Sequence, residues 1–182
     1  MSNLNQYQKL DWAVPGKPFG TGGDGSTTIT TDPCTRATVT GGAGGYTSTI
    51  GATILTNGDA VLLHQTQYTG AGHWEFARVA SGGGTTSITW TRHLNYSYVG
   101  GAQVIKFPMY NALTVNAHSA TSWNGSTGGI EVLCGRTSIG IGGAVSINGG
   151  SASGYSGGSG GGFYGGDGFY QAGGSHGAYY GE

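Results

Sequence analysis

Short runs of β-branched and aromatic residues alternate with turn residues over residues 21–115. The turns are rich in glycine, as in TGGDGS, TNGDA and SGGG. This pattern is typical of β-strands joined by tight turns. It predicts strands at residues 27–31, 36–40, 52–56, 60–64, 74–79, 86–91, 94–99, 103–107 and 113–115. No segment keeps a 3.6-residue hydrophobic period, so we expect essentially no helix.

Alternation within the runs predicts which side chains face inward. Ile88 and Trp90 share one face of their run, so both are expected in the core. Three consecutive apolar residues at 61–63 indicate a strand that is covered on both faces.

The run WEFARV contains two competing sets of side chains. Trp74 and Phe76 form an apolar set, and the charged residues of the run are Glu75 and Arg78. We expect the two aromatic rings to face the interior and both charges to face solvent. A β-sandwich or a β-solenoid body would satisfy this arrangement.

The spacing of apolar residues changes after Pro108, where the predicted strands become very short. Apolar residues at 130–133, 139–141 and 145–147 are separated by corners at Gly135 and at the glycine pair 142–143. Three such strands in about twenty residues have the length of one coil of a parallel β-helix. A single coil cannot bury its open end, which the preceding sheet, the following segment or another subunit must cover.

The last segment, residues 149–182, is nearly half glycine and contains a period of three. Such a period is that of an extended polyproline-II-type helix, so the segment is expected to be polyglycine-II-like; a Gly/Ser linker is the alternative. The doublets in FYGGDG and FYQAGG are regularly placed, and a third doublet follows. We predict that these aromatic residues contact another subunit or a glycan: Phe163, Tyr164, Phe169, Tyr170, Tyr179 and Tyr180.

These patterns predict an all-β fold with four parts. They are an N-terminal arm at residues 1–20, a β-rich body at 21–117, a solenoid-like coil at 118–148 and the glycine-rich and aromatic-rich tail at 149–182. The arm either docks on a neighbouring subunit or is a frayed terminus.

Composition narrows the range of partners. Charged residues make up 8% of the chain and the formal net charge is -1, which gives no electrostatic basis for binding nucleic acid or an anionic membrane. No apolar run is long enough to insert into a membrane, and the N-terminus lacks the features of a signal peptide. A polar surface with few charges suits fibres and carbohydrate. We therefore expect an extracellular or virion-surface location, reached on a particle, by a leaderless route or after processing.

Candidate chemistry is sparse in this sequence. The body contains five carboxylates, and their spacing does not indicate a catalytic pair: Asp24, Asp32, Asp59, Glu75 and Glu131. Its histidines form no HExxH motif, and the two GDG sequences do not match a calcium loop. We expect no catalytic residues, no metal and no cofactor. Cys34 and Cys134 are expected to be buried free thiols, with a disulfide as the alternative.

Several runs together resemble a known class of protein modules. They are VLLHQTQYTGAGHWEFARVASG, GAQVIKFPMYNALTVN and TSWNGSTGGIEVLCGRTSIGIGGAVSINGG, followed by the glycine-rich continuation. This part of the chain resembles glycine-rich modules of bacterial surface proteins and of bacteriophage tail-fibre or tail-tip proteins. The resemblance covers most of the chain after Gly20 and implies a fold type and a location, but no reaction.

The hypothesis that follows is a non-enzymatic structural protein that assembles with itself into an extracellular fibre or a phage tail fibre. A receptor-binding or glycan-binding module is the second hypothesis, in which the tail aromatics contact the ligand. A glycan-active enzyme on a β-helix is the third.

Overall fold

The computed structural model describes residues 22–147. These residues form eleven β-strands. They contain no helix, as the sequence predicted, and therefore no helix that could cross a membrane. The strands are β1 (Thr27–Ile29), β2 (Thr35–Gly41), β3 (Thr47–Ile50), β4 (Ala60–Gln65), β5 (Trp74–Ser81), β6 (Ser87–Trp90), β7 (Tyr98–Lys106), β8 (Tyr110–Val115), β9 (His118–Ser119), β10 (Gly135–Ile141) and β11 (Val145–Ser146).

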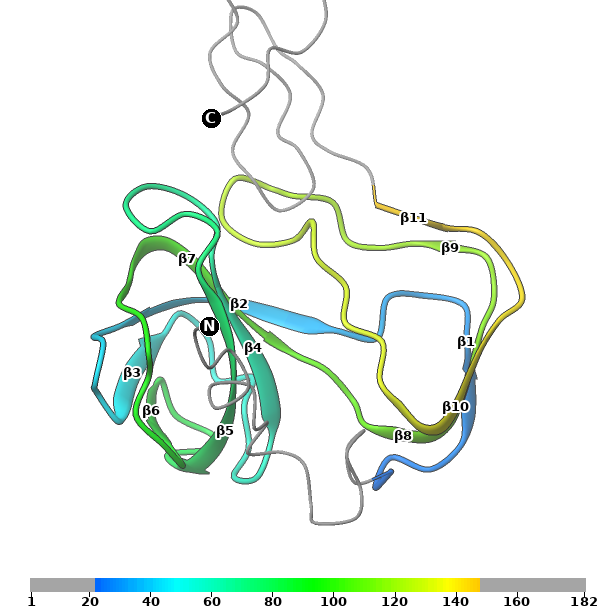
Figure 1. Ribbon diagram of the computed structural model, residues 1–182, viewed down its shortest axis with the longest axis horizontal. Helices are drawn as coiled ribbons and strands as arrows, with labels where there is room; N and C mark the ends of the chain where they lie inside the picture. Colours follow the sequence, from blue (N-terminus) through cyan, green and yellow to red (C-terminus); the bar gives the residue numbers. More distant parts are fainter. Residues whose placement is uncertain (1–21, 148–182) are drawn as a thin grey trace, which may run out of the picture.

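Six antiparallel strands close into a barrel in the order β2-β3-β6-β5-β4-β7 (Figure 1). Closure comes from β2, which pairs with β3 on one side and with β7 on the other. A closed barrel leaves no unpaired strand edge, which short strands in an open sheet would expose. The body is therefore a barrel rather than the expected sandwich or solenoid.

Two small parallel sheets lie beside the barrel, at the right of Figure 1. In one, β8 lies between β1 and β10; in the other, β9 pairs with β11. The chain bends between β8 and β9 and again between β10 and β11. The later pair of strands lies along the earlier one, since β10 pairs with β8 and β11 pairs with β9. Sheets of two and three strands do not make a solenoid, and the expected division into domains stays a prediction.

Three apolar clusters account for the core. The barrel interior contains Ala37, Val39, Ile50, Leu55, Val61, Leu63, Ala77, Val79, Ile88, Trp90, Leu94, Tyr98, Ala102 and Val104. A second cluster, between the outer face of the barrel and the segment at residues 130–134, contains Cys34, Ala60, Leu62, Ile105, Phe107, Met109 and Cys134. A third, on the parallel strands, contains Ile29, Leu113 and Val115.

The two face predictions that rest on simple alternation are confirmed. Ile88 and Trp90 are 0% and 1% exposed inside the barrel. Strand β4 is buried at every position, because Val61 and Leu63 face the barrel interior while Leu62 packs in the second cluster.

The prediction for WEFARV was wrong. Trp74 is 45% exposed, whereas Glu75 is 5% exposed and lies on the same strand face as Ala77 and Val79. The inward-facing set is thus Glu75, Ala77 and Val79, which includes a charged residue. Hydrogen bonds to the Glu75 carboxylate compensate its burial, as described below.

Other differences concern strand boundaries. The run at 52–56 is not a strand but a loop whose Leu55 is fully buried. Its backbone is held by the Asp59 carboxylate, which accepts a hydrogen bond from Thr56 N at 2.7 Å. The prediction missed β3, since its sequence TSTI contains a single large apolar residue.

The remaining boundary errors fall around β7 and in the predicted coil. The end of the run predicted at 94–99 and most of the run at 103–107 belong to one strand, β7, which continues through the glycine pair at 100–101, whereas residues 94–97 are not in a strand. The run at 130–133 is extended but unpaired, and it covers the outer face of the barrel instead.

Candidate functional site

One end of the barrel is built from three connections that face the same way. The chain turns from β2 to β3 through residues 42–46, from β4 to β5 through 66–73 and from β6 to β7 through 91–97. Neighbouring strands around the barrel are antiparallel, so β2, β4 and β6 end where β3, β5 and β7 begin, and the three connections meet at one end of the barrel. Backbone hydrogen bonds from Gly44 N to Leu94 O and from Leu94 N to Gly45 O join the first connection to the third. We call this end the aromatic rim.

All four exposed large aromatic side chains of residues 22–147 lie on this rim. Tyr46, Tyr68, Trp74 and Tyr96 are 50%, 74%, 45% and 38% exposed.

Two histidine rings pack against two of these tyrosines. His93 contacts Tyr46 edge to face, with ring centroids 4.0 Å apart, and His73 stacks on Tyr96 at 4.3 Å. The rim therefore presents a series of rings from all three connections.

A buried carboxylate fixes the connection that holds Tyr96. Glu75 accepts hydrogen bonds from the backbone N and side-chain Nδ2 of Asn95, from Tyr96 N and from the Tyr98 hydroxyl, at 2.8–3.2 Å. Arg92 Nη2 lies 3.7 Å from the same carboxylate. Burial, together with the Glu75 charge, raises the pKa of Tyr98, so its hydroxyl remains a donor. Glu75 thus positions the rim from beneath.

A buried side-chain amide fixes the connection from β4 to β5. Gln65 is fully buried, and its Oε1 accepts a hydrogen bond from Val99 N at 2.9 Å. Its Nε2 donates to the carbonyl oxygens of Gln67 and Gly100. The side chain therefore ties the loop after β4 to the first residues of β7.

Tyr68 has a constrained conformation although its ring is the most exposed on the rim. Its φ angle is +62°, the only positive φ among the described non-glycine residues. A tyrosine in the left-handed region is uncommon and costs energy unless the surroundings impose it. Here a Cβ placed on Gly101 would lie 2.9 Å from Tyr68 Cδ2, so the ring rests directly on the β7 backbone. Strain of this kind concentrates at binding sites.

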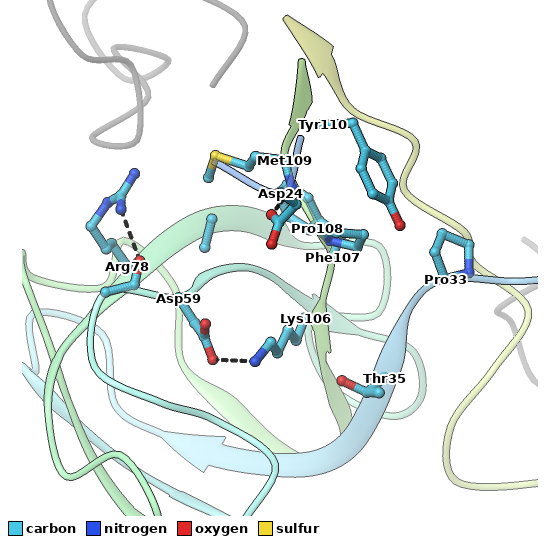
Figure 2. A pocket seen from close by; sticks show the side chains of 12 residues that line it. Asp24, Pro33, Thr35, Asp59, Arg78, Lys106, Phe107, Pro108, Met109 and Tyr110 are labelled. Atoms are coloured by element: carbon cyan, nitrogen blue, oxygen red, sulfur yellow. Dashed lines mark hydrogen bonds and ion pairs between the residues drawn. The ribbon is translucent and has the colours of Figure 1, made fainter. Parts of the chain in front are cut away.

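The opposite end of the barrel has a cavity of about 330 Å³ (Figure 2). It is lined by Asp24, Pro33, Thr35, Gly58, Asp59, Ala60, Arg78, Lys106, Phe107, Pro108, Met109 and Tyr110. Asp59 Oδ2 forms an ion pair with Lys106 Nζ at 2.8 Å, and Asp24 Oδ2 accepts a hydrogen bond from Met109 N at 2.7 Å. Burial, together with the nearby Asp24 charge, raises the pKa of Tyr110. The carboxylates of the cavity are thus engaged in structural contacts.

A buried charged cluster joins the barrel to the parallel sheets. Arg36 Nη2 pairs with Asp32 Oδ2 at 2.6 Å, and the guanidinium also donates to Ile130 O. Asp32 accepts hydrogen bonds from Thr121 N and Cys34 N. Burial alone would raise the pKa of Asp32, but these hydrogen bonds and the Arg36 charge outweigh it and lower the pKa.

His118 and Glu131 form an ion pair next to this cluster. Both side chains are 2% exposed, and His118 Nε2 lies 2.8 Å from Glu131 Oε1. Its Nδ1 lies 2.9 Å from the carbonyl oxygen of Asn116, which can only accept. Both ring nitrogens must therefore donate, which requires the imidazolium. The hydrogen bond to Asn116 and the one to Glu131 raise the pKa of His118.

This pair predicts a loss of stability at alkaline pH. A folded-state pKa above the unfolded value of about 6.5 gives stability that is complete below that pH and is lost as pH rises through the folded pKa. We expect the free energy of unfolding in urea to exceed that of His118→Gln by more at pH 5.5 than at pH 9. A difference that is the same at both pH values would contradict a charged His118.

Comparison with known proteins adds little to this geometry. No family model matches the chain, and no curated protein matches it. One solved structure is distantly similar. It is the Gp54 tailspike of Acinetobacter baumannii bacteriophage AP22 in complex with A. baumannii capsular saccharide, at 14% identity and a TM-score of 0.32. The match covers 52% of this chain and 18% of the tailspike, and so weak a similarity assigns neither fold nor ligand.

The six tail aromatics predicted as contacts lie outside the described residues, so that prediction is untested: Phe163, Tyr164, Phe169, Tyr170, Tyr179 and Tyr180. Of the body carboxylates, only Asp24 and Asp59 are brought into one cavity. Sequence reasoning did not single out Tyr46 and Tyr68. A tyrosine within a glycine-rich turn sequence, as in GGY and YTGAG, was the feature of the sequence that could have indicated these two residues.

The cysteines are as expected. Cys34 and Cys134 are both free and buried, and both pack in the second apolar cluster. Burial raises the pKa of the Cys34 thiol to about 12, so it is a poor nucleophile. Within residues 22–147, no three His, Cys, Asp or Glu side chains are grouped so as to hold a metal ion.

Proposed function

We propose that this chain is a non-enzymatic structural module of an extracellular fibre or virion tail structure, and that its aromatic rim binds a cell-surface carbohydrate. The observation that supports this most is the position of the four exposed aromatic side chains at one end of the barrel. Binding residues are often carried on loops that a rigid scaffold holds in place. Here Glu75 and Gln65 hold two of the three connections from beneath.

The chemistry of the rim fits a sugar better than other ligands. Tyrosine and tryptophan offer an apolar face with a polar group at the edge, and sugars likewise combine apolar C–H faces with hydroxyl groups. The exposed Asn95, Ser97 and His73 add polar groups beside the rings. Sites for single-stranded nucleic acid combine aromatic rings with a basic groove. With seven Lys and Arg in the whole chain, the rim has no such groove.

Removing three rim rings is expected to abolish most carbohydrate binding. The variant Tyr46→Ser/Tyr68→Asn/Tyr96→Ser retains the buried supports, and asparagine tolerates the left-handed conformation of residue 68. Because central aromatic contacts contribute about 2 kcal/mol or more, affinity should fall at least about thirtyfold. Binding is measured on an oligosaccharide array and to intact bacterial cells, with urea unfolding to show that the variant is folded.

A matched control separates the rim from the tail. The variant Phe163→Ser/Tyr164→Ser/Phe169→Ser/Tyr170→Ser keeps the rim and should bind carbohydrate like the unmodified chain. If it loses binding while the rim variant retains it, the tail is the site and the rim proposal is wrong. Absence of binding by the unmodified chain to every glycan and cell tested would also refute the proposal.

The non-enzymatic part has its own test in the same samples. Shortened glycans released by the unmodified chain but not by Asp24→Asn/Asp59→Asn would make the cavity of Figure 2 an active site. We expect no shortened product. Self-assembly, which the sequence analysis assigned to the tail aromatics, stays a prediction.

A further inference from the structure

The stack of parallel strands is open on one side. Leu113 and Val115 in β8 are 1% and 0% exposed, whereas their partners in β10, Ile139 and Ile141, are 43% and 61% exposed. In-register parallel neighbours point to the same face, so these isoleucines continue the apolar core of β8. No described strand pairs with the outer edge of β10. The edge therefore exposes unpaired backbone groups together with apolar side chains.

An apolar cavity of about 150 Å³ adjoins this open edge. It is lined by Phe76, Phe107, Val132, Leu133, Cys134, Gly135 and Ile139. The cavity thus lies between the outer face of the barrel and β10. An apolar side chain that entered it would gain contacts that its lining now lacks.

The spacing of the stacked strands indicates how much chain is needed to cover the edge. Leu113 pairs with Ile139, 26 positions later, and His118 pairs with Val145, 27 positions later. At least 35 residues, 148–182, follow the exposed Ile147, more than one further circuit.

Two aromatic doublets flank the positions that lie one circuit beyond β10. One circuit beyond Ile139 and Ile141 come Gly165 and Asp167, between the doublets at 163–164 and 169–170. Glycine permits close approach to a neighbouring backbone, and the flanking rings supply the apolar groups that the edge lacks.

We propose that residues 163–170 of the same chain pack on the outer edge of β10 and cover Ile139, Ile141 and the adjoining cavity. The described chain ends at Ile147, six residues after β10, and residue 163 follows sixteen positions later. A short connection gives such a segment an effective concentration of about a millimolar or more, which a second copy of the chain does not reach in dilute solution. This docking is independent of the carbohydrate proposal, which concerns the aromatic rim.

The test uses a thiol reporter in the full chain. In Ile141→Cys the new thiol should be alkylated by iodoacetamide at least about tenfold more slowly than the thiol of Thr40→Cys, an exposed position on β2. Both native cysteines are buried, so they give little background. Ile139→Cys, on the same strand and 43% exposed, is a second reporter should Ile141→Cys fold poorly.

The serine variants then identify the covering segment. Adding Phe163→Ser/Tyr164→Ser/Phe169→Ser/Tyr170→Ser should raise the alkylation rate of the reporter to that of Thr40→Cys, whereas Tyr179→Ser/Tyr180→Ser, which lies beyond one circuit, should leave it slow. Protection that is independent of protein concentration supports the proposal. Protection that increases with concentration would mean that a second copy covers the edge, and fast alkylation in the full chain would mean that nothing does. Either result overturns the proposal.

Discussion

Replacing Glu75 with alanine is expected to lower the free energy of unfolding by about 3–5 kcal/mol. The carboxylate is 5% exposed and accepts hydrogen bonds from Asn95, Tyr96 and Tyr98. Its removal leaves the buried Tyr98 hydroxyl and the part-buried Asn95 and Tyr96 donors without this acceptor, and opens space inside the end of the barrel. The change is measured by urea unfolding, with circular dichroism to show that the β-structure remains.

Two further variants separate the role of Glu75 from general packing. Glu75→Gln keeps the volume but replaces one acceptor with a donor that faces other donors, so we expect an intermediate loss of about 1–3 kcal/mol. Thr49→Ala, at an exposed position on β3, should change stability by about 0.5 kcal/mol or less. If Glu75→Ala were as stable as Thr49→Ala, the carboxylate would not hold the rim.

Glu75 also shows why alternation alone misassigned β5. The pattern of WEFARV is satisfied by either face, and hydrophobicity favoured the one with Trp74 and Phe76. What decides the orientation is a set of donors from residues 95–98, about twenty positions away, that converge on one carboxylate. A buried charge becomes acceptable only when such partners exist. Their convergence is a property of the closed barrel and cannot be read from the strand.

The fold class was predictable from local signals, but the closure of the sheet was not. Turn residues and β-branched runs located most strands, and β4 was correctly expected to be covered on both faces. Barrel and sandwich differ in the pairing of β2 with β7, which joins Gly41 to Tyr98 and Thr35 to Lys106, residues 57 and 71 positions apart. No local pattern specifies that pairing. The stacking of β10 on β8 is equally non-local.

The candidate site, too, could be predicted from the sequence only in part. The sequence directed attention to the tail doublets because they repeat, whereas Tyr46, Tyr68 and Tyr96 are single residues in separate turns. They form one surface only because three connections lie at the same end of the barrel. The expectation that exposed aromatics carry binding stays a prediction, and placing Tyr46, Tyr68 and Tyr96 on one surface required the fold.

Trp90→Ala is expected to be among the most destabilising substitutions in the barrel, with a loss of about 3–5 kcal/mol in the free energy of unfolding. Trp90 is 1% exposed, and its indole Nε1 donates a hydrogen bond to Ser48 Oγ at 2.8 Å. The substitution leaves a large cavity among the barrel strands and an unpaired buried hydroxyl on Ser48. Urea unfolding at neutral pH measures the loss.

Trp74→Ala is the matched control, because both residues were expected in the core and only Trp90 lies there. With a ring that is 45% exposed and contacts Phe76 edge to face, Trp74 should contribute about 1 kcal/mol or less to stability. Its loss should instead weaken carbohydrate binding, since the ring belongs to the aromatic rim. Equal destabilisation by the two substitutions would place Trp74 in the core after all. Full stability together with unchanged binding in Trp74→Ala would remove that ring from the proposed site and leave the three tyrosines as its aromatic members.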